Sequence, residues 1–400
     1  MDAEVNPTGR APDGPPIGFD ALSEDSLRAA GSLKWTRYGA AIGAFVAEMD
    51  FGTAPEVTAA LHDAVDRGRL GYLTTEAATD MARACADWQR RRYGWQVPPD
   101  RITPLADVVA GLQVAIERFT PPGSAVVLPT PAYMPFLAVP GLLGRELVEV
   151  PMVERDGRPS YDLDGIARAF AGGAGLLVHV NPHNPLGRVF SAEEQLALAE
   201  VVEDAGARVF SDEIHAPLVL PGAAHRPYAS LSPVTAGHAL TATSASKAWN
   251  LPGLKAAQLI LTNADDAASW EQVGFLYTHG ASTPGVLAAT AAYDSGGPWL
   301  DGVLAYLDGN RRHLGALLAE HLPEVRWRPP EGTYLAWLDC RELRLPTSAG
   351  AFFLERAGVA MVDGPECGAP GAGHVRLNVA TPRPVLTAIV RRMADAVRRG

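Results

Sequence analysis

From about residue 45 to residue 293, short apolar runs alternate with amphipathic helical stretches. Six of these runs have the length and composition of strands: Ala125–Leu128, Leu147–Val150, Leu176–Val180, Arg208–Ser211, Ala239–Thr243 and Gln258–Leu261. Helical segments separate several of them, and the segment Ala192–Ala205 follows a capping box formed by Ser191 and Glu194. Because strands that alternate with helices form parallel sheets covered on both faces, this pattern predicts an α/β fold.

The pattern changes after about residue 299. A long helix is predicted over Gly302–His321, followed by short strands around Tyr334–Leu338 and His374–Val379 and by a C-terminal helix from Pro384. This arrangement is typical of a smaller α+β domain.

The two patterns divide the chain into three parts. We expect an N-terminal arm and part of the small domain in residues 1–45, a large domain in 46–293 and a C-terminal small domain in 294–400. Residues 1–18 are rich in proline and glycine and predict a flexible or wrapping arm.

Composition narrows the possible functions. The net charge is −11, so the chain lacks the basic surface with which proteins bind nucleic-acid phosphates. The three cysteines, Cys85, Cys340 and Cys367, lie far apart, which excludes a disulfide scaffold and a cysteine-built zinc site and fits a cytoplasmic protein. No signal peptide is visible at the N-terminus. The uncharged stretch Ser124–Gly144 contains four prolines and predicts a buried strand and loop rather than a membrane helix.

Several common enzyme motifs are missing. The sequence contains no phosphate loop of the G-x-x-x-x-G-K-[ST] type, no G-x-G-x-x-G after a strand and no G-x-S-x-G elbow. The sequence therefore gives no support for a nucleotide hydrolase, a Rossmann dehydrogenase or a serine hydrolase.

Lysine is rare in this chain, since only three of the 34 basic residues are lysines. Lys247 follows a predicted strand together with Ser244 and Ser246, and Lys255 lies eight residues further on. Small hydroxyl groups after a strand bind phosphate, and a lysine in an apolar setting can form an imine with an aldehyde. The alternative is a surface lysine in a serine-rich turn.

Asp212 ends a second predicted strand, at the sheet edge where ligands bind in open α/β folds. If the cofactor is pyridoxal phosphate, a carboxylate here would keep the ring nitrogen protonated so that the ring can accept electrons. The alternative is a helix N-cap, which is a common use of aspartate after a strand.

Two further segments carry polar groups that suit a small ligand. Asn184 lies in a loop with two Asn-Pro steps, which force a rigid turn and point an amide inward; the alternative is an ordinary turn. Arg376 alternates with apolar residues in a predicted strand, and its planar guanidinium suits a substrate carboxylate. The alternative for Arg376 is a structural ion pair.

Four motifs in this order resemble a fold-type I, pyridoxal-phosphate-dependent enzyme of the class I/II aminotransferase family. They are N-P-H-N-P-L-G-R from Asn181, S-D-E-I-H from Ser211, S-A-S-K ending at Lys247 and R-L-N from Arg376. The closer resemblance is to the cystathionine β-lyase-like (MalY/PatB-type) branch of C–S lyases. It extends from about residue 30 to the C-terminus and includes these further segments: Lys34-Trp35, Ala47–Phe51, Gly253–Lys255, Pro330–Tyr334 and Trp337–Cys340.

The resemblance implies an aspartate aminotransferase-like fold, in which a large domain with a mostly parallel seven-stranded sheet flanked by helices accompanies a smaller α+β domain. It implies pyridoxal 5'-phosphate as cofactor, no metal, and a homodimer with a shared active site. The implied reaction is α,β-elimination of cystathionine or a cysteine S-conjugate to a thiol, pyruvate and ammonia. Transamination is the alternative, and a non-catalytic regulatory protein is a third hypothesis.

The resemblance also assigns roles to residues. Lys247 forms the imine with the cofactor and moves the substrate's Cα proton. The cofactor-binding residues are expected to be Tyr72, Val108, Val109, Tyr133, Asn184, Asp212, His215, Ser244, Ser246 and Lys255. Of these, Tyr133 stacks on the ring, while Asn184 and His215 lie near its hydroxyl. Tyr72 reaches the phosphate from the other subunit, and Arg376, with Asn184, takes the substrate carboxylate.

Four positions depart from the family pattern. Asp107 replaces a glycine beside the phosphate, where a carboxylate is repelled unless it turns away. The other three departures are Leu186 for threonine, Glu48 for aspartate and Cys367 for phenylalanine.

Overall fold

A computed structural model describes residues 18–399 of the chain and contains a large mixed sheet of seven strands. Its strands are β2 (Ile102–Leu105), β3 (Ala125–Thr130), β4 (Leu147–Pro151), β7 (Ala174–Val180), β8 (Arg208–Asp212), β9 (Ala239–Thr243) and β10 (Ala257–Leu261). They are arranged in the order β2-β10-β9-β8-β7-β3-β4, and β10 alone runs opposite to the other six strands. The predicted α/β class with a mostly parallel seven-stranded sheet is therefore confirmed.

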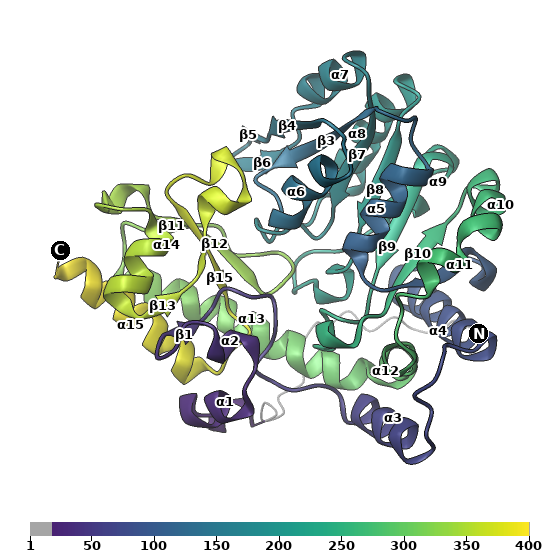
Figure 1. Cartoon of the computed structure of the whole chain (residues 1–400). Helices are drawn as coiled ribbons and strands as arrows, with labels where there is room; N and C mark the ends of the chain where they lie inside the picture. The colour runs from purple at the N-terminus through teal and green to yellow at the C-terminus, as the bar shows by residue number, and fades with distance from the viewer. Residues whose placement is uncertain (1–17, 400) are drawn as a thin grey trace, which may run out of the picture.

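Helices cover both faces of this sheet (Figure 1). The helices beside it are α3 (Pro55–Asp66), α4 (Thr75–Tyr93), α5 (Val108–Arg118), α6 (Met134–Leu142), α7 (Leu163–Ala171), α8 (Ala192–Asp204), α9 (Pro233–His238), α10 (Ala264–Val273), α11 (Phe275–Thr278) and α12 (Thr283–Ser295). Successive strand residues enter different cores: Val209 packs in the core that includes α4, α8 and α12, and Phe210 in the core that includes α5 and α6. Burial on both faces explains the nearly continuous apolar runs of these strands.

A second, antiparallel sheet has the order β11-β12-β15-β14. Its strands are β11 (Arg326–Trp327), β12 (Leu335–Asp339), β14 (Val362–Asp363) and β15 (His374–Asn378), and beside it lie α13 (Gly297–His321), α14 (Ala349–Phe352) and α15 (Arg383–Arg398). The chain's N-terminal elements join this part through β1 (Ile42–Gly43), which pairs with β13 (Val359–Ala360). The remaining elements are α1 (Glu24–Ala30), α2 (Leu33–Thr36), β5 (Val153–Arg155) and β6 (Arg158–Ser160). The predicted domain boundaries stay a prediction.

The structure corrects the sequence analysis in a few places. The expected loop within Ser124–Gly144 is wrong, because residues Met134–Leu142 form helix α6 with Pro135 in its first turn, where a missing N–H costs nothing. Strand β2 was not predicted, and α13 begins at Gly297, five residues before the predicted start at Gly302. Apart from Gly18, the expected arm lies outside the described residues. Within residues 18–399, no helix is long and apolar enough to cross a membrane.

Candidate active site

The sequence-predicted residues meet at the carboxyl ends of the three central strands. Asp212 is the last residue of β8, Asn184 lies in the loop that follows β7, and Lys247 lies in the turn after β9. These strands are neighbours in the sheet, so the loops that follow them lie side by side. Arg376 reaches the same place from β15 of the second sheet, where its guanidinium donates to Asn184 Oδ1 over 2.9 Å.

The Lys247 side chain is half-buried, and its amine donates a hydrogen bond to the backbone carbonyl of Ala47 over 3.0 Å. Burial, reinforced by the positive charge of Arg376, lowers the pKa of Lys247 to about 8. A sizeable fraction of this amine is therefore unprotonated near neutral pH, and an unprotonated amine can attack an aldehyde or remove a proton. Lys247 is thus partly buried and hydrogen-bonded, unlike a freely exposed lysine in a surface turn.

Asp212 is a buried carboxylate that lacks a cationic hydrogen-bond partner among the described residues. Its Oδ1 accepts a hydrogen bond from the backbone amide of Ile214 over 3.0 Å. Burial raises the pKa of Asp212 to about 7, and the neighbouring Glu213 acts in the same direction. A protonated ring nitrogen placed against this carboxylate would supply the missing positive charge.

Arg376 is buried, and two oxygen atoms accept hydrogen bonds from it in addition to the Met134 sulfur. Nη1 donates to Asn184 Oδ1, and Nη2 donates to the Phe45 carbonyl over 2.7 Å. Its Nε has no hydrogen-bond partner, and no carboxylate of residues 18–399 forms an ion pair with this guanidinium. The alternative of a structural ion pair therefore finds no support, and the guanidinium keeps its charge available for a bound carboxylate.

Two ring side chains complete this end of the site. Tyr133 precedes α6, and burial raises the pKa of its hydroxyl. His215 packs edge-on against Tyr334 with ring centroids 6.0 Å apart. The pKa of His215 lies well below its usual range because the ring is buried, and its buried Nδ1 has no hydrogen-bond partner. A neutral histidine with a vacant nitrogen can bind a polar group of a ligand.

The expected phosphate site lies at the N-terminus of α5, where the amides of Val108 and Val109 occupy the first helical turn. The first amides of a helix have no intrahelical acceptor and attract anions. Asp107 caps this helix: Oδ1 accepts from the Ala110 amide over 2.8 Å, and Oδ2 pairs with Lys255 Nζ at 3.0 Å. Its carboxylate is therefore held by the helix and by a lysine rather than turned away from both.

Ser244 and Ser246 lie in the turn that follows β9. Ser244 Oγ donates to the Ala256 carbonyl over 2.7 Å and accepts from the Ser246 amide over 3.0 Å. Ser244 thus fixes the turn that leads from β9 to Lys247, and the Ser246 hydroxyl forms no hydrogen bond within the described residues.

Tyr72 is the exception among the predicted site residues. It lies in the loop between α3 and α4 with 90% of its surface exposed, and its nearest aromatic neighbour is His279, 6.3 Å away between ring centroids. A single chain therefore does not bring Tyr72 into its own site.

The site also contains groups that the sequence analysis did not assign. The Ala47 carbonyl accepts hydrogen bonds from Lys247 and from the buried Tyr334 hydroxyl, the latter over 2.9 Å. Asn378 donates to the carbonyls of Val46 and Glu48 over 2.7 and 2.6 Å. Backbone acceptors leave no residue signature, but Tyr334 lies in the segment Pro330–Tyr334 that the family resemblance had already singled out.

The residues present fit pyridoxal phosphate. Lys247 offers an amine of lowered pKa, Asp212 a carboxylate without a cation, and His215 a vacant buried nitrogen. The amides at the start of α5 suit a phosphate, although Asp107 adds a negative charge beside them.

Comparisons with known proteins agree with this geometry. The family model "Aminotransferase class I and II" matches residues 45–393. Cystathionine beta-lyase of Corynebacterium glutamicum is 39% identical over 95% of this chain and 100% of its own length. Cystathionine beta-lyase PatB of Bacillus subtilis is 35% identical over 92% of this chain and 96% of its own. The pyridoxal-phosphate-bound C-S lyase of Staphylococcus hominis superposes with a TM-score of 0.87 at 29% identity, covering 92% of this chain and 96% of that one. The protein is therefore a member of the class I and II aminotransferase family.

Proposed function

We propose that the protein is a pyridoxal-phosphate-dependent carbon–sulfur β-lyase that converts cystathionine or another cysteine S-conjugate into a thiol, pyruvate and ammonia. The observation that carries the proposal is the grouping of Lys247 with the buried Asp212 and Arg376, brought together from the turn after β9, β8 and β15. Relatives 35% and 39% identical to the chain bear the name cystathionine beta-lyase, which supports a lyase over other activities of the family.

Each residue has a separate task in this proposal. Arg376 binds the substrate's α-carboxylate, with the Asn184 amide beside it. Lys247 holds the cofactor between turnovers and then removes the Cα proton, which its lowered pKa permits near neutral pH. Asp212 holds the ring nitrogen protonated, and Tyr133 lies against the ring. When bound, the cofactor withdraws electrons from Cα. The C–S bond breaks with its electron pair on sulfur, which leaves as a thiolate.

We also propose a homodimer in the cytoplasm with one small-molecule substrate and no nucleic-acid or membrane partner. The dimer is supported by Tyr72 and by large apolar side chains that are exposed in the single chain, among them Leu70, Phe275 and Leu276. Large exposed apolar side chains are typical of protein interfaces where they gather into a patch. In the dimer, Tyr72 would enter the partner's site at the phosphate end.

The decisive experiment mixes cofactor-loaded protein with L-cystathionine in the absence of a keto acid. Continuous release of pyruvate and free thiol, many equivalents per site, is the expected result. A single equivalent of keto acid, with the cofactor left in its amine form, would instead identify an aminotransferase. Wild-type protein that releases no product from cystathionine or from any simple S-alkyl cysteine would contradict the proposal.

Lys247→Ala should abolish turnover, because no other amine of the described site lies in its position. Lys247→Arg is the matched control, since it keeps a positive charge but cannot form an imine or accept a proton at neutral pH. We expect both variants to lose at least a thousandfold in rate, on the scale seen when covalent catalysts are removed. Wild-type-like rates in Lys247→Arg would contradict the site assignment.

A further inference from the structure

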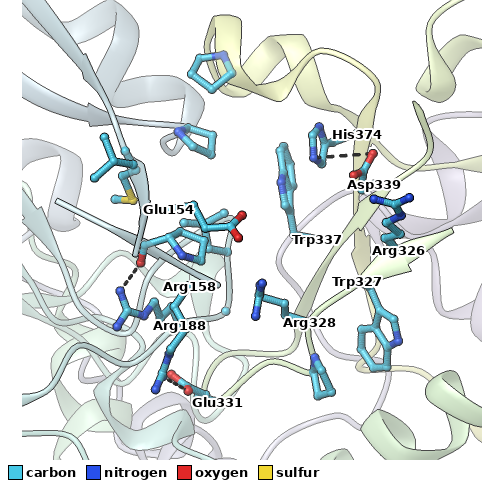
Figure 2. A pocket seen from close by; sticks show the side chains of 18 of the residues that line it. Glu154, Arg158, Arg188, Arg326, Trp327, Arg328, Glu331, Trp337, Asp339 and His374 are labelled. Carbon is cyan, nitrogen blue, oxygen red and sulfur yellow. Dashed lines mark hydrogen bonds and ion pairs between the residues drawn. The ribbon is translucent and has the colours of Figure 1, made fainter. Parts of the chain in front are cut away.

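A cavity of about 830 Å³ lies between the two sheets, beside the site described above (Figure 2). Its walls come from the β5–β6 hairpin, from the loop after β7 and from one face of the second sheet at β11, β12 and β15. Nothing in the proposed chemistry at Lys247 uses the charged side chains that line this cavity.

Some of the residues that line the cavity are neighbours of Arg376 and Asn184. Trp337 lines it and stands directly opposite Arg376 in the β12–β15 ladder, so the two side chains share one face of that sheet. On the other wall, Leu186 and Gly187 follow Asn184, which binds Arg376. A substrate held by its carboxylate at Arg376 therefore has this cavity beside it, available for the group attached to its sulfur.

Most charges in the cavity wall are already neutralised by ion pairs. The paired arginines are Arg158 with Glu331, Arg188 with Glu194, Arg326 with Glu342 and Arg341 with Asp339. Arg328 and Glu154 are different, because among residues 18–399 neither forms an ion pair or a side-chain hydrogen bond. An unpaired charged side chain is stable in water. A ligand that carries the opposite charges can form a charge-assisted hydrogen bond with each of these two side chains.

Arg328 and Glu154 come from opposite walls and point into the same space (Figure 2). Both lie near Gly157 at the tip of the β5–β6 hairpin: Arg328 Nη2 is 3.4 Å and Glu154 Oε1 3.9 Å from the point where a Cβ on Gly157 would stand. One unpaired cation and one unpaired anion beside the same point of the wall offer a partner to each of the two charges of an amino-acid head group.

We propose that Arg328 and Glu154 select substrates whose leaving thiol itself carries an amino-acid head group. Arg328 binds the distal carboxylate and Glu154 the distal ammonium group. This inference rests on the proposed lyase function and adds the residues that set its leaving-group specificity.

The test compares kcat and KM for three substrates that differ only at the far end. L-Cystathionine carries both distal charges, S-(3-carboxypropyl)-L-cysteine carries the carboxylate alone, and S-propyl-L-cysteine carries neither. We expect Arg328→Gln to lower kcat/KM about tenfold for the first two, mainly through KM, and to leave the third unchanged, because one charge-assisted hydrogen bond is worth roughly that much. Glu154→Gln should affect cystathionine alone.

Arg326→Gln is the matched control, since Arg326 lines the same cavity but is paired with Glu342. It should leave all three substrates unchanged. If wild-type protein cleaves the substrates and Arg328→Gln changes all three equally or none, the specificity proposal is wrong while the lyase function stands. If wild-type protein cleaves none of them, the proposed function itself fails.

Discussion

Asp107 places a carboxylate where the cofactor's phosphate is expected to bind. It pairs with Lys255 at 3.0 Å and caps α5, so it competes with a phosphate for the positive charge at both places. Asp107→Asn removes the charge and keeps an equally good helix cap. We expect the cofactor's dissociation constant to fall several-fold, measured by titrating cofactor-free protein and following absorbance. Weaker binding in the variant would show that Asp107 instead orders the site.

The buried carboxylate of Asp212 predicts a pH-dependent stability. Burial raises its pKa from 3.8 to about 7, so the folded protein holds a proton that the unfolded chain has already lost between these values. Stability of the cofactor-free protein therefore falls as pH rises from about 4 to about 7, and the deficit is complete above that range. Asp212→Asn should stabilise this form by roughly 4 kcal/mol at pH 8 and by little at pH 4.

Urea unfolding of both proteins at the two pH values checks this prediction. Asparagine can still accept the Ile214 amide through its own Oδ1, so the local turn is retained. An equal difference at pH 4 and pH 8 would mean that the carboxylate is not ionised at a cost in the folded protein.

At the residue scale, sequence reasoning found the side chains with distinctive chemistry. Lys247, Asp212 and Asn184, which lie at or after strand ends, and Arg376, which lies within β15, are close together in the structure, while their roles stay a prediction. It could not find the carbonyls that hold these side chains, because every residue has one. Nor could it show whether Asp107 turns away, since that depends on Lys255, 148 residues further along the chain.

At the scale of elements, the segment from α2 to α3 is fixed by a buried ion pair. Lys34 Nζ lies 2.8 Å from Asp50 Oδ2 with both side chains almost fully buried, and Trp35 Nε1 donates to Asp50 Oδ1 over 2.8 Å. Asp50→Ala would leave the lysine charge buried and unpaired. We expect a loss of about 3–5 kcal/mol in the free energy of unfolding, measured with urea.

The control for this prediction is Asp63→Ala, which breaks an exposed pair with Arg67 on α3. Exposed pairs contribute below about 1 kcal/mol, so this variant should remain close to wild type. Comparable losses in the two variants would contradict a special role for the buried pair. Lys34, one of only three lysines, thus serves structure rather than chemistry.

Helices and strands were predicted correctly where the periodicity of apolar residues along the sequence was clear. Strand β9 has its predicted bounds, and α8 begins after the Ser191–Glu194 capping box as expected. Strand β2 was not predicted because Ile102–Leu105 has only four residues, one of them a proline, which is too short for a recognisable hydrophobic pattern. That β10 runs antiparallel could not be predicted either, since strand direction depends on the path of the whole chain.

At the scale of the whole molecule, the proposed dimer can be tested by mixing subunits. Lys247→Ala removes a group from a subunit's own site, whereas Tyr72→Ala removes one from its partner's. A mixed dimer of the two variants should contain one intact site, so random mixing should restore about a quarter of wild-type activity. Activity of the mixture is measured after refolding the two chains together.

The matched control mixes Lys247→Ala with Arg376→Ala. These residues belong to one site of one chain, since the charge of Arg376 acts on the Lys247 amine. No mixed dimer then has an intact site, and activity should not return. Recovery in this control, or none in the first mixture, would contradict a site shared through Tyr72.

The segment Ala44–Phe51 bears on how the protein is made. Its carbonyls accept hydrogen bonds from Lys247, 200 residues away, and from Arg376, 331 residues away. During translation this segment is therefore synthesised early, and Lys247 and Arg376, which bind its carbonyls, are synthesised much later. Contacts of such long sequence separation slow folding. Translation thus completes the cofactor-binding part of the site around Lys247 before the substrate-binding part. The latter is complete only when β15, with Arg376, has emerged from the ribosome.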